Sequence, residues 1–204
     1  MSEGSRVAKA DRTRRWSTTP DTKAAILAAA QSVFLDFGYT AANVSDVVER
    51  SGSSVGSIYH HFGGKAELFQ ALCRGYHDTL HDASAQAMTA AREAGVTDPV
   101  DLFAESARAY MEQAWAHREM TRLVHGGDHP QGHVRWRREQ FQLWLSEVTE
   151  LFMVTTDSPG DRVRLLVLTT ISSDAARLLT EIDSPDEAGE IIEAALVLVR
   201  KLAS

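Results

Sequence analysis

The chain has 204 residues, which is long enough for one large domain or two small ones and for at least one substantial hydrophobic core. The formal net charge of −7 argues against a uniformly basic nucleic-acid-binding surface, but up to Lys65 there are 8 Lys/Arg against 6 Asp/Glu, a local basic excess compatible with a local DNA-contact surface or with chance scatter. The single cysteine excludes an intrachain disulfide, and no apolar run approaches the ~20 residues that span a bilayer, so we expect a cytoplasmic protein with no membrane partner.

Residues 1–18 are rich in cations and contain almost nothing to bury, which predicts a flexible basic arm. From residue 19 onward the pattern is helical, without the sustained alternation that is typical of strands. Four of the five prolines follow a capping residue, an arrangement typical of the first turn of a helix. These pairs are Thr19-Pro20, Asp98-Pro99, Ser158-Pro159 and Ser184-Pro185. We therefore predict an all-α fold.

Apolar residues at helical spacing, together with caps and glycines, predict the helices in chain order. The first four are expected over Asp21–Phe37 (ended by Gly38), from an Asn43 cap to Arg50, from a Ser54 cap to His61, and from Gly63-Gly64 to Gly95. Five more are expected over Pro99–His117, Glu119–His125, Val134–Val154, Pro159–Ile182 and Pro185–Leu202.

Asn43–Phe62 has the layout of a helix-turn-helix, because a short helix ends at Ser51-Gly52 and Ser54 caps the next one. In this motif the second helix enters the major groove with its N-terminal residues nearest the bases. Those residues are Val55, Gly56 and Ser57, none of which is long enough to block a close approach. Three later side chains are expected to reach phosphates: Tyr59, His60 and Lys65.

The same region carries a family resemblance in an ordered series of residues. The series is Phe34-x-x-x-Gly38-Tyr39-Thr40, then Val44-x-Asp46-Val47-Val48, then Ser51-Gly52-x-Ser54-x-Gly56-x-Ile58-Tyr59-His60-His61-Phe62-x-x-Lys65-x-x-Leu68. It resembles the signature of the TetR family of bacterial transcriptional repressors, from Ile26 to Phe69. The resemblance implies phosphate contacts from Thr40, Ser54, Tyr59, His60 and Lys65, and base contacts from Val55, Gly56 and Ser57. Ser45, Ser53 and Val55 depart from the usual pattern, which leaves fewer cationic contacts and favours the basic arm as a supplement.

By resemblance, the chain is expected to divide into a flexible arm at 1–18, a helix-turn-helix DNA-binding domain at 19–65 and a helical ligand-binding and dimerisation domain at 66–204. The expected function is sequence-specific regulation of transcription, as a repressor that an unknown small-molecule inducer releases from a near-palindromic double-stranded operator. We expect a homodimer, no enzymatic activity and no cofactor. An architectural DNA binder without an inducer is the alternative.

Two apolar faces near the C-terminus predict the dimer interface, because they exceed what one core contact needs. They are Val167, Leu168, Ile171, Ala175, Leu178 and Ile182, and Ile191, Ile192, Ala195, Leu198, Val199 and Leu202. The aromatic and sulfur side chains of the preceding helices predict either ordinary core or the lining of a ligand pocket. The pocket candidates are Met111, Trp115, Phe141 and Trp144, with His117 or His125 at the mouth.

Two other patterns indicate competing chemistry. Residues 52–56 satisfy G-x-S-x-G, the nucleophile motif of α/β-hydrolases, but the motif needs a preceding strand and the sequence predicts a helix there. Histidines four residues apart at His77 and His81, and the loop that holds His125, Asp128, His129 and His133, have spacings that could bind zinc. The loop is rich in glycine and the helical pair is flanked by aspartates, which favours exposed surface, so no metal is predicted.

Overall fold

The computed structural model describes residues 19–152 and 158–203, and within these ranges every regular element is helical. The basic arm at 1–18 and the predicted end of one helix at Val154 lie outside the described residues. The elements are α1 (Thr19–Ala41), α2 (Val44–Ser51), α3 (Val55–Phe62), α4 (Lys65–Glu93), α5 (Pro99–Ala116), α6 (Arg118–His125), α7 (His133–Leu151), α8 (Pro159–Leu178), the 3-10 turn η1 (Leu179–Glu181) and α9 (Pro185–Ala203). The all-α prediction is confirmed.

Asp98 and Ser158 cap the starts of α5 and α8, as the sequence predicts. The Asp98 carboxylate accepts a hydrogen bond from the Val100 N–H at 2.7 Å, and the Ser158 hydroxyl accepts one from the Gly160 N–H at 3.2 Å. Each satisfies a backbone donor that the first turn of a helix leaves without a partner. The predicted stop at Gly38 is instead a kink with φ 73° and ψ 177°, after which α1 continues for three more residues.

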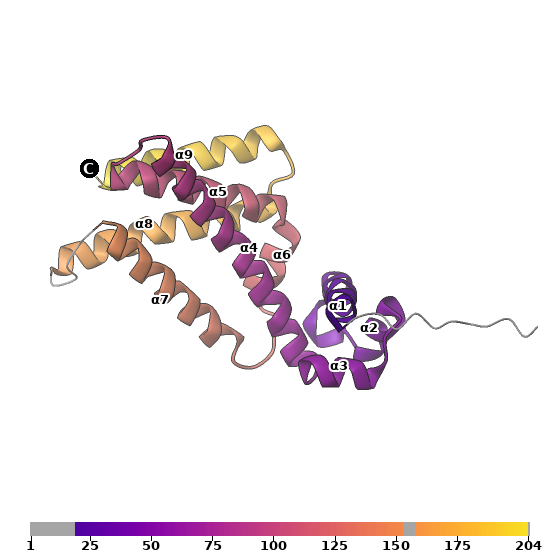
Figure 1. Ribbon diagram of the computed structural model, residues 1–204. Coiled ribbons are helices and arrows are strands. Elements are labelled where there is room, and N and C mark those ends of the chain that lie inside the picture. Colours follow the sequence, from indigo (N-terminus) through magenta and orange to yellow (C-terminus); the bar gives the residue numbers. More distant parts are fainter. Residues whose placement is uncertain (1–18, 153–157, 204) are drawn as a thin grey trace, which may run out of the picture.

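α1, α2 and α3 form a small head around one buried cluster (Figure 1). Ile26, Ala30 and Val33 of α1 are fully buried, and Ile58 of α3 is buried with them. Residues Pro20–Ala41 are, among the described residues, the one segment long and apolar enough to cross a bilayer, with a mean hydropathy of 1.2. Because their apolar stripe is the core of the head, we interpret α1 as a core helix.

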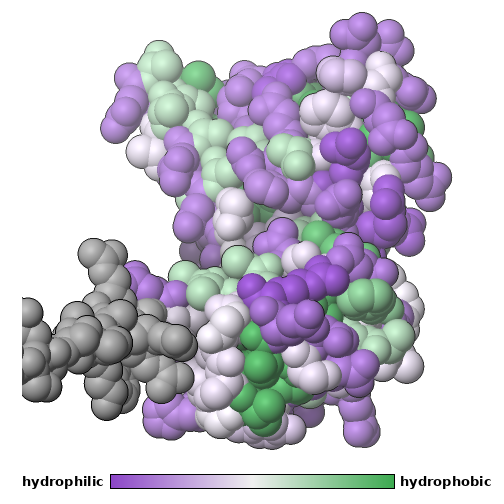
Figure 2. Space-filling view, turned by 90° about the vertical axis from the view of Figure 1, so that its right-hand side faces the viewer, coloured by the Kyte–Doolittle hydropathy of each residue, from purple (hydrophilic) through white to green (hydrophobic). Residues whose placement is uncertain are grey.

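α4 joins the head to the body and belongs to both (Figure 1). Its N-terminal residues Leu68, Phe69 and Leu72 complete the buried cluster of the head, and the remainder packs most extensively along α5. A second buried cluster lies in the body, where α5, α8 and α9 meet around Leu168 and Leu196. Seen from the head end, the head forms the lower lobe and the body the upper lobe of the molecule (Figure 2).

Candidate nucleic-acid interface and body cavity

The link between α2 and α3 has the geometry that a helix-turn-helix requires. Gly52 ends α2 in the left-handed region at φ 64° and ψ 13°, a conformation that glycine adopts without steric cost. Ser54 then caps α3, since its hydroxyl accepts a hydrogen bond from the Ser57 N–H at 3.1 Å. Ile58 fixes the inner face of α3 in the core. The turn and the cap therefore hold α3 at a defined angle to α2.

The outer face of α3 is left open. Val55 is 50% exposed and Tyr59, one turn later, is 54% exposed, while Gly56 and His60 beside them are also exposed. A Cβ added at Gly56 would meet only the Ser54 hydroxyl, at 3.9 Å, so this part of the backbone is open to a close approach. Ser57 is half-buried. An exposed helix start without long side chains is the shape that the major groove accepts.

Lys65, at the edge of this face, links the start of α4 to the end of α1. Its ammonium donates hydrogen bonds to the Thr40 carbonyl at 3.0 Å and to the Ala42 carbonyl at 2.7 Å, and it lies 4.6 Å from the centre of the Tyr39 ring. These carbonyls end α1, where helices leave acceptors without partners. An ammonium has three N–H donors, so one remains after these two bonds. The sequence suggests only a phosphate contact for this residue and misses the clip between α1 and α4.

Comparison with known proteins identifies the fold and the head. The profile of bacterial regulatory proteins of the tetR family matches residues 26–72. The chain is 47% identical over 49 residues to the transcriptional repressor AcnR of Corynebacterium efficiens, which covers 24% of this chain and 26% of that protein. It is 38% identical over 63 residues to the transcriptional activator FasR of Mycolicibacterium smegmatis, with 31% and 29% covered. A TetR-family regulator of Syntrophomonas wolfei has the same fold, with a TM-score of 0.72 at 16% identity over 91% of this chain and 96% of that one.

Residues 26–72 therefore form a helix-turn-helix head of the tetR-family type. The matched segments of these two curated relatives span under a third of their length, so the resemblance in sequence is that of the head alone. The resemblance to the solved structure extends over the body but shows only the fold.

The hydrolase alternative fails on geometry and on family. The residues before Ser54 form α2 and the Gly52 turn, where a nucleophile motif would need a strand, and the Ser54 hydroxyl is held by the Ser57 N–H. The TetR family is a family of transcriptional regulators.

The TetR head is poor in free cations. Residues 19–65 contain Lys23, Arg50 and Lys65 against four acidic side chains. Arg50 is paired with Asp36 at 2.5 Å, and Lys65 is held by two carbonyls. The local basic excess of the sequence therefore comes from the arm at 1–18, which lies outside the described residues.

A carboxylate of the body reaches the head at Thr40. Asp128, in the loop between α6 and α7, accepts hydrogen bonds from the Thr40 N–H at 3.0 and 3.1 Å and from the Thr40 hydroxyl. The hydroxyl bond, then the backbone bond, hold the pKa of Asp128 below its ordinary value. The kink at Gly38 makes room for this contact, since a Cβ there would collide with the Asp128 carboxylate. Thr40, a predicted phosphate contact, thus has both its donors engaged by the body.

The histidines of the same loop have separate tasks. His133 is fully buried and its ring lies 2.8 Å from the Val124 carbonyl, while His125 contacts Arg137. Among residues 19–152 and 158–203, no group of three or more His, Cys, Asp or Glu side chains is arranged to hold a metal ion.

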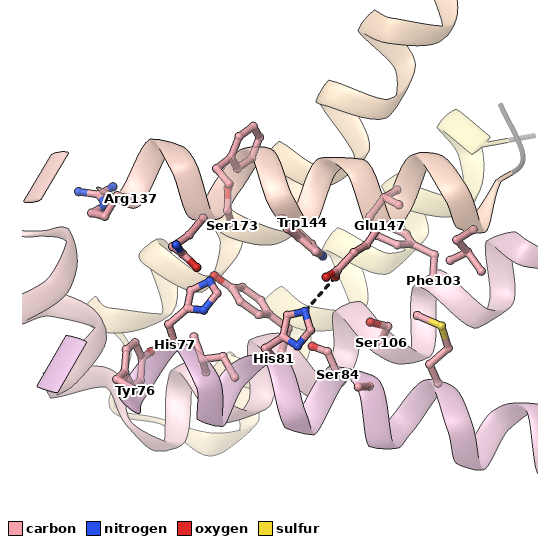
Figure 3. Close-up of a pocket in the computed structure, with 18 of the residues that line it drawn as sticks. Tyr76, His77, His81, Ser84, Phe103, Ser106, Arg137, Trp144, Glu147 and Ser173 are labelled. Carbon is pink, nitrogen blue, oxygen red and sulfur yellow. Dashed lines mark hydrogen bonds and ion pairs between the residues drawn. The ribbon is translucent and has the colours of Figure 1, made fainter. Parts of the chain in front are cut away.

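A cavity of about 760 Å³ lies in the body between α4, α5 and α7 (Figure 3). Its size is within the range of small-molecule sites, and its walls combine aromatic, aliphatic and polar side chains. The Trp144 ring is stacked on the Tyr110 ring with centroids 5.6 Å apart, and lies 6.4 Å from the Phe103 ring. Polar side chains that line the cavity include His77, His81, Ser84, Ser106, Arg137, Glu147 and Ser173 (Figure 3).

The cavity brings together two of the four pocket candidates. Phe141 and Trp144 line it, and so does His125. Met111 is fully buried in the core of the body, and the Trp115 indole N–H donates to the Ile182 carbonyl at 3.1 Å; neither lines the cavity, nor does His117. Met111 belongs to the packed core of the body, and Trp115 and Trp144 pack against the same cluster, but of these three only Trp144 also lines the cavity.

α4 contributes histidine side chains to the cavity that the sequence pattern does not place there. Tyr76, Leu80 and the pair His77 and His81 line the cavity, although the aspartates beside the histidines indicate exposed surface. His81 lies 2.9 Å from the Glu147 carboxylate of α7, so the pair faces across the cavity (Figure 3). Burial lowers the pKa of His77. The four-residue spacing of the two histidines is the signal in the sequence, but it does not indicate which face of α4 they occupy.

Proposed function

We propose that the protein regulates transcription by binding a specific double-stranded DNA sequence through α3. The observation that supports this most strongly is the capped helix-turn-helix, whose open α3 face lies within the segment that matches the TetR profile. Residues 19–65 are the proposed DNA-binding domain and 66–204 the proposed ligand-binding and dimerisation domain. Repression is proposed because it is the activity that AcnR's name states, and FasR marks activation as the second candidate.

The proposed base contacts come from Val55, Gly56 and Ser57, at the N-terminal end of α3. Proposed phosphate contacts come from two exposed side chains of α3, Tyr59 and His60. Ser54, Thr40 and Lys65 complete the set, each with a structural bond as well. Because the described head offers few cations, we propose that the arm at 1–18 supplies much of the charge that attracts DNA.

We propose that two chains pair through α8 and α9. Both helices keep large apolar side chains exposed, and exposed apolar surface of this kind is typical of a protein–protein interface. Leu198 is 50% exposed and Leu178 49%. The predicted faces need revision, however, because Leu168, Ile192, Ala195 and Val199 lie in the protomer's own core. The exposed apolar residues of the two helices are Val163, Leu166, Val167, Leu178, Val197, Leu198 and Leu202.

We propose that a small molecule in the cavity controls the head. α6 ends at the cavity with His125, and three residues later Asp128 holds Thr40. A ligand that displaces α6 or α7 would move the loop between them and with it the contact on α1. A tenfold change in DNA affinity needs only about 1.4 kcal/mol of coupling.

Selection of bound DNA from a random duplex pool tests the proposal. A pair of heads related by two-fold symmetry should enrich a near-palindromic site with half-sites about 34–36 Å apart, or a longer site. Tyr59→Phe should weaken binding to the selected and to random DNA alike, by about 1–2 kcal/mol, since phosphates carry no sequence information. A wild-type chain that enriches no sequence from the pool would refute the proposal.

A further inference from the structure

A guanidinium that has no ion-pair partner among the described residues lies at one end of the cavity. Arg137 lines the cavity from α7, is half-buried, and lies apart from the Glu147 carboxylate (Figure 3). Its hydrogen bond joins its Nη2 to the His125 ring, 3.0 Å away. Within residues 19–152 and 158–203, no ion pair involves Arg137.

His125 adds a second donor rather than a counter-charge. A guanidinium can only donate, so the His125 Nδ1 accepts this bond and its ring proton lies on Nε2. Burial, and then the charge of Arg137, lower the pKa of His125 to about 4, so the ring is neutral near pH 7. This end of the cavity therefore presents N–H groups from two side chains.

Arg137 itself supplies the positive charge at this end. Burial lowers the pKa of Arg137, Tyr110 raises it, and the Arg177 guanidinium on α8, which is paired with Asp174 at 3.2 Å, lowers it. Two acidic side chains line the cavity, Glu147 and Glu150, and Glu147 is engaged by His81. Burying a cation without a partner is costly, and the cost falls when an anion binds beside it.

The remainder of the cavity suits an apolar group. Beyond Arg137 the apolar part of the wall is formed by Leu80, Phe103, Tyr110, Phe141 and Trp144, beside the polar side chains named above. Tyr110 is buried enough that its pKa is raised to about 12, so its hydroxyl stays neutral. We propose that the cavity binds a small apolar monocarboxylate whose carboxylate pairs with Arg137 and whose apolar part lies against these rings. This names the ligand class of the proposed inducer site and therefore rests on the proposed function.

Matched pairs of ligands test the proposal on the full-length protein. Decanoate is compared with decanol, and naphthoate with naphthylmethanol, by isothermal titration calorimetry. Each pair shares its apolar part and differs in the anionic group, so the aliphatic and aromatic pairs also distinguish the shape of that part. In the wild type, at least one carboxylate should bind about ten- to a hundredfold more tightly than its alcohol, the range expected for a charged hydrogen bond.

Arg137→Gln should remove most of this preference while leaving the affinity for the alcohol within about threefold. Arg135→Gln is the matched control, because Arg135 is on the same helix, is exposed and pairs with Glu139 at 2.8 Å. Arg137→Lys, which keeps the charge and loses the paired N–H geometry, should be intermediate. If Arg137→Gln fails to fold, the carboxylate and alcohol affinities of the wild type and of Arg137→Lys still test the proposal.

Equal affinity of the wild type for both members of each pair, or binding of none of the four probes, would overturn the inference. So would a carboxylate preference that Arg137→Gln retains. DNA binding is measured on the same preparation without ligand. A chain that selects DNA but prefers no carboxylate contradicts only this inference, whereas a chain that binds the carboxylate through Arg137 but selects no DNA contradicts only the proposed function.

Discussion

Replacing Asp128 with Asn should raise DNA affinity while lowering the stability of the protein. The carboxylate holds both donors of Thr40, the N–H and the hydroxyl, at a position that we propose for a DNA phosphate. Asn keeps the shape of the side chain and one acceptor oxygen but removes the charge. The substitution therefore takes a negative charge away from the side of α1 that we propose to face DNA.

The size of the gain in DNA affinity follows from the distance between the Asp128 carboxylate and a DNA phosphate that contacts the same Thr40 hydroxyl. A phosphate on the Thr40 hydroxyl would lie roughly 5 Å from the Asp128 carboxylate, where two like charges repel by about 0.8 kcal/mol in water and by more near a protein surface. Salt at physiological strength, with a screening length of about 8 Å, reduces this. We expect about three- to tenfold tighter binding per head at low salt, and a decrease of about 0.5–1.5 kcal/mol in the free energy of unfolding because the bonds to Thr40 are weaker.

The assay is fluorescence anisotropy with the selected operator, at two salt concentrations, beside thermal unfolding of the free protein. Asp98→Asn is the control, because it removes the same charge from a helix cap of the body. The pKa of Asp128 is held below its ordinary value, so its stabilising effect is present at neutral pH and disappears only as the pH falls through that depressed pKa. DNA affinity that stays equal or falls in Asp128→Asn would refute the reasoning.

Four further predictions test other parts of the account. Gly38→Ala should destabilise the protein by about 1–3 kcal/mol, because φ 73° with ψ 177° is a glycine conformation. Adding Asp128→Ala to this variant should relieve only the collision between the new Cβ and the carboxylate. If the double variant regains the full wild-type stability in thermal unfolding, the backbone at Gly38 is not strained. Lys65→Met should lower the free energy of unfolding by about 1–3 kcal/mol without DNA present, since it removes the bonds to the Thr40 and Ala42 carbonyls; an unchanged melting temperature contradicts the clip. Leu198→Arg should give a folded monomer by light scattering while Leu143→Arg, at a 59% exposed position on α7, stays dimeric; two dimers would place the interface elsewhere. Deleting the residues before Ser17 should make the slope of log K against log salt shallower by about 0.9 for each phosphate that the arm neutralises, and an unchanged slope would remove the arm from the interface.

Local signals are sufficient for the helices and for the head. Caps such as Asp98 and Ser158 act through hydrogen bonds within two residues, so the sequence alone predicts where a helix begins. The C-terminal ends of helices are predicted less accurately. The helix predicted to run from Pro159 to Ile182 ends as α8 at Leu178, and its last turn is the 3-10 turn η1 at Leu179–Glu181. At Gly38 the sequence indicates a break, but the continuation to Ala41 depends on packing.

Contacts between distant segments could not be predicted in the same way. Asp128 and Thr40 are 88 residues apart, and no local pattern pairs them. For the body, helical spacing predicts which residues face inward but does not separate a packed core from a cavity wall. Met111 and Trp144 show this, because both face inward and only Trp144 meets open space. The polar aspartates beside His77 and His81 indicate solvent, although the two histidines line the cavity.

The most direct test of the central claim, that α3 reads DNA, is to repeat the selection from a random duplex pool with Val55→Gln beside the wild type. Val55 is 50% exposed and its side chain has no hydrogen-bonding group, so the substitution leaves the fold unchanged. A glutamine at this position can form paired hydrogen bonds with adenine in the major groove. The account predicts that both proteins select sites of the same length and symmetry, and that the variant changes the preferred base at one position, equally in both half-sites. Identical selected sequences for the two proteins would contradict it.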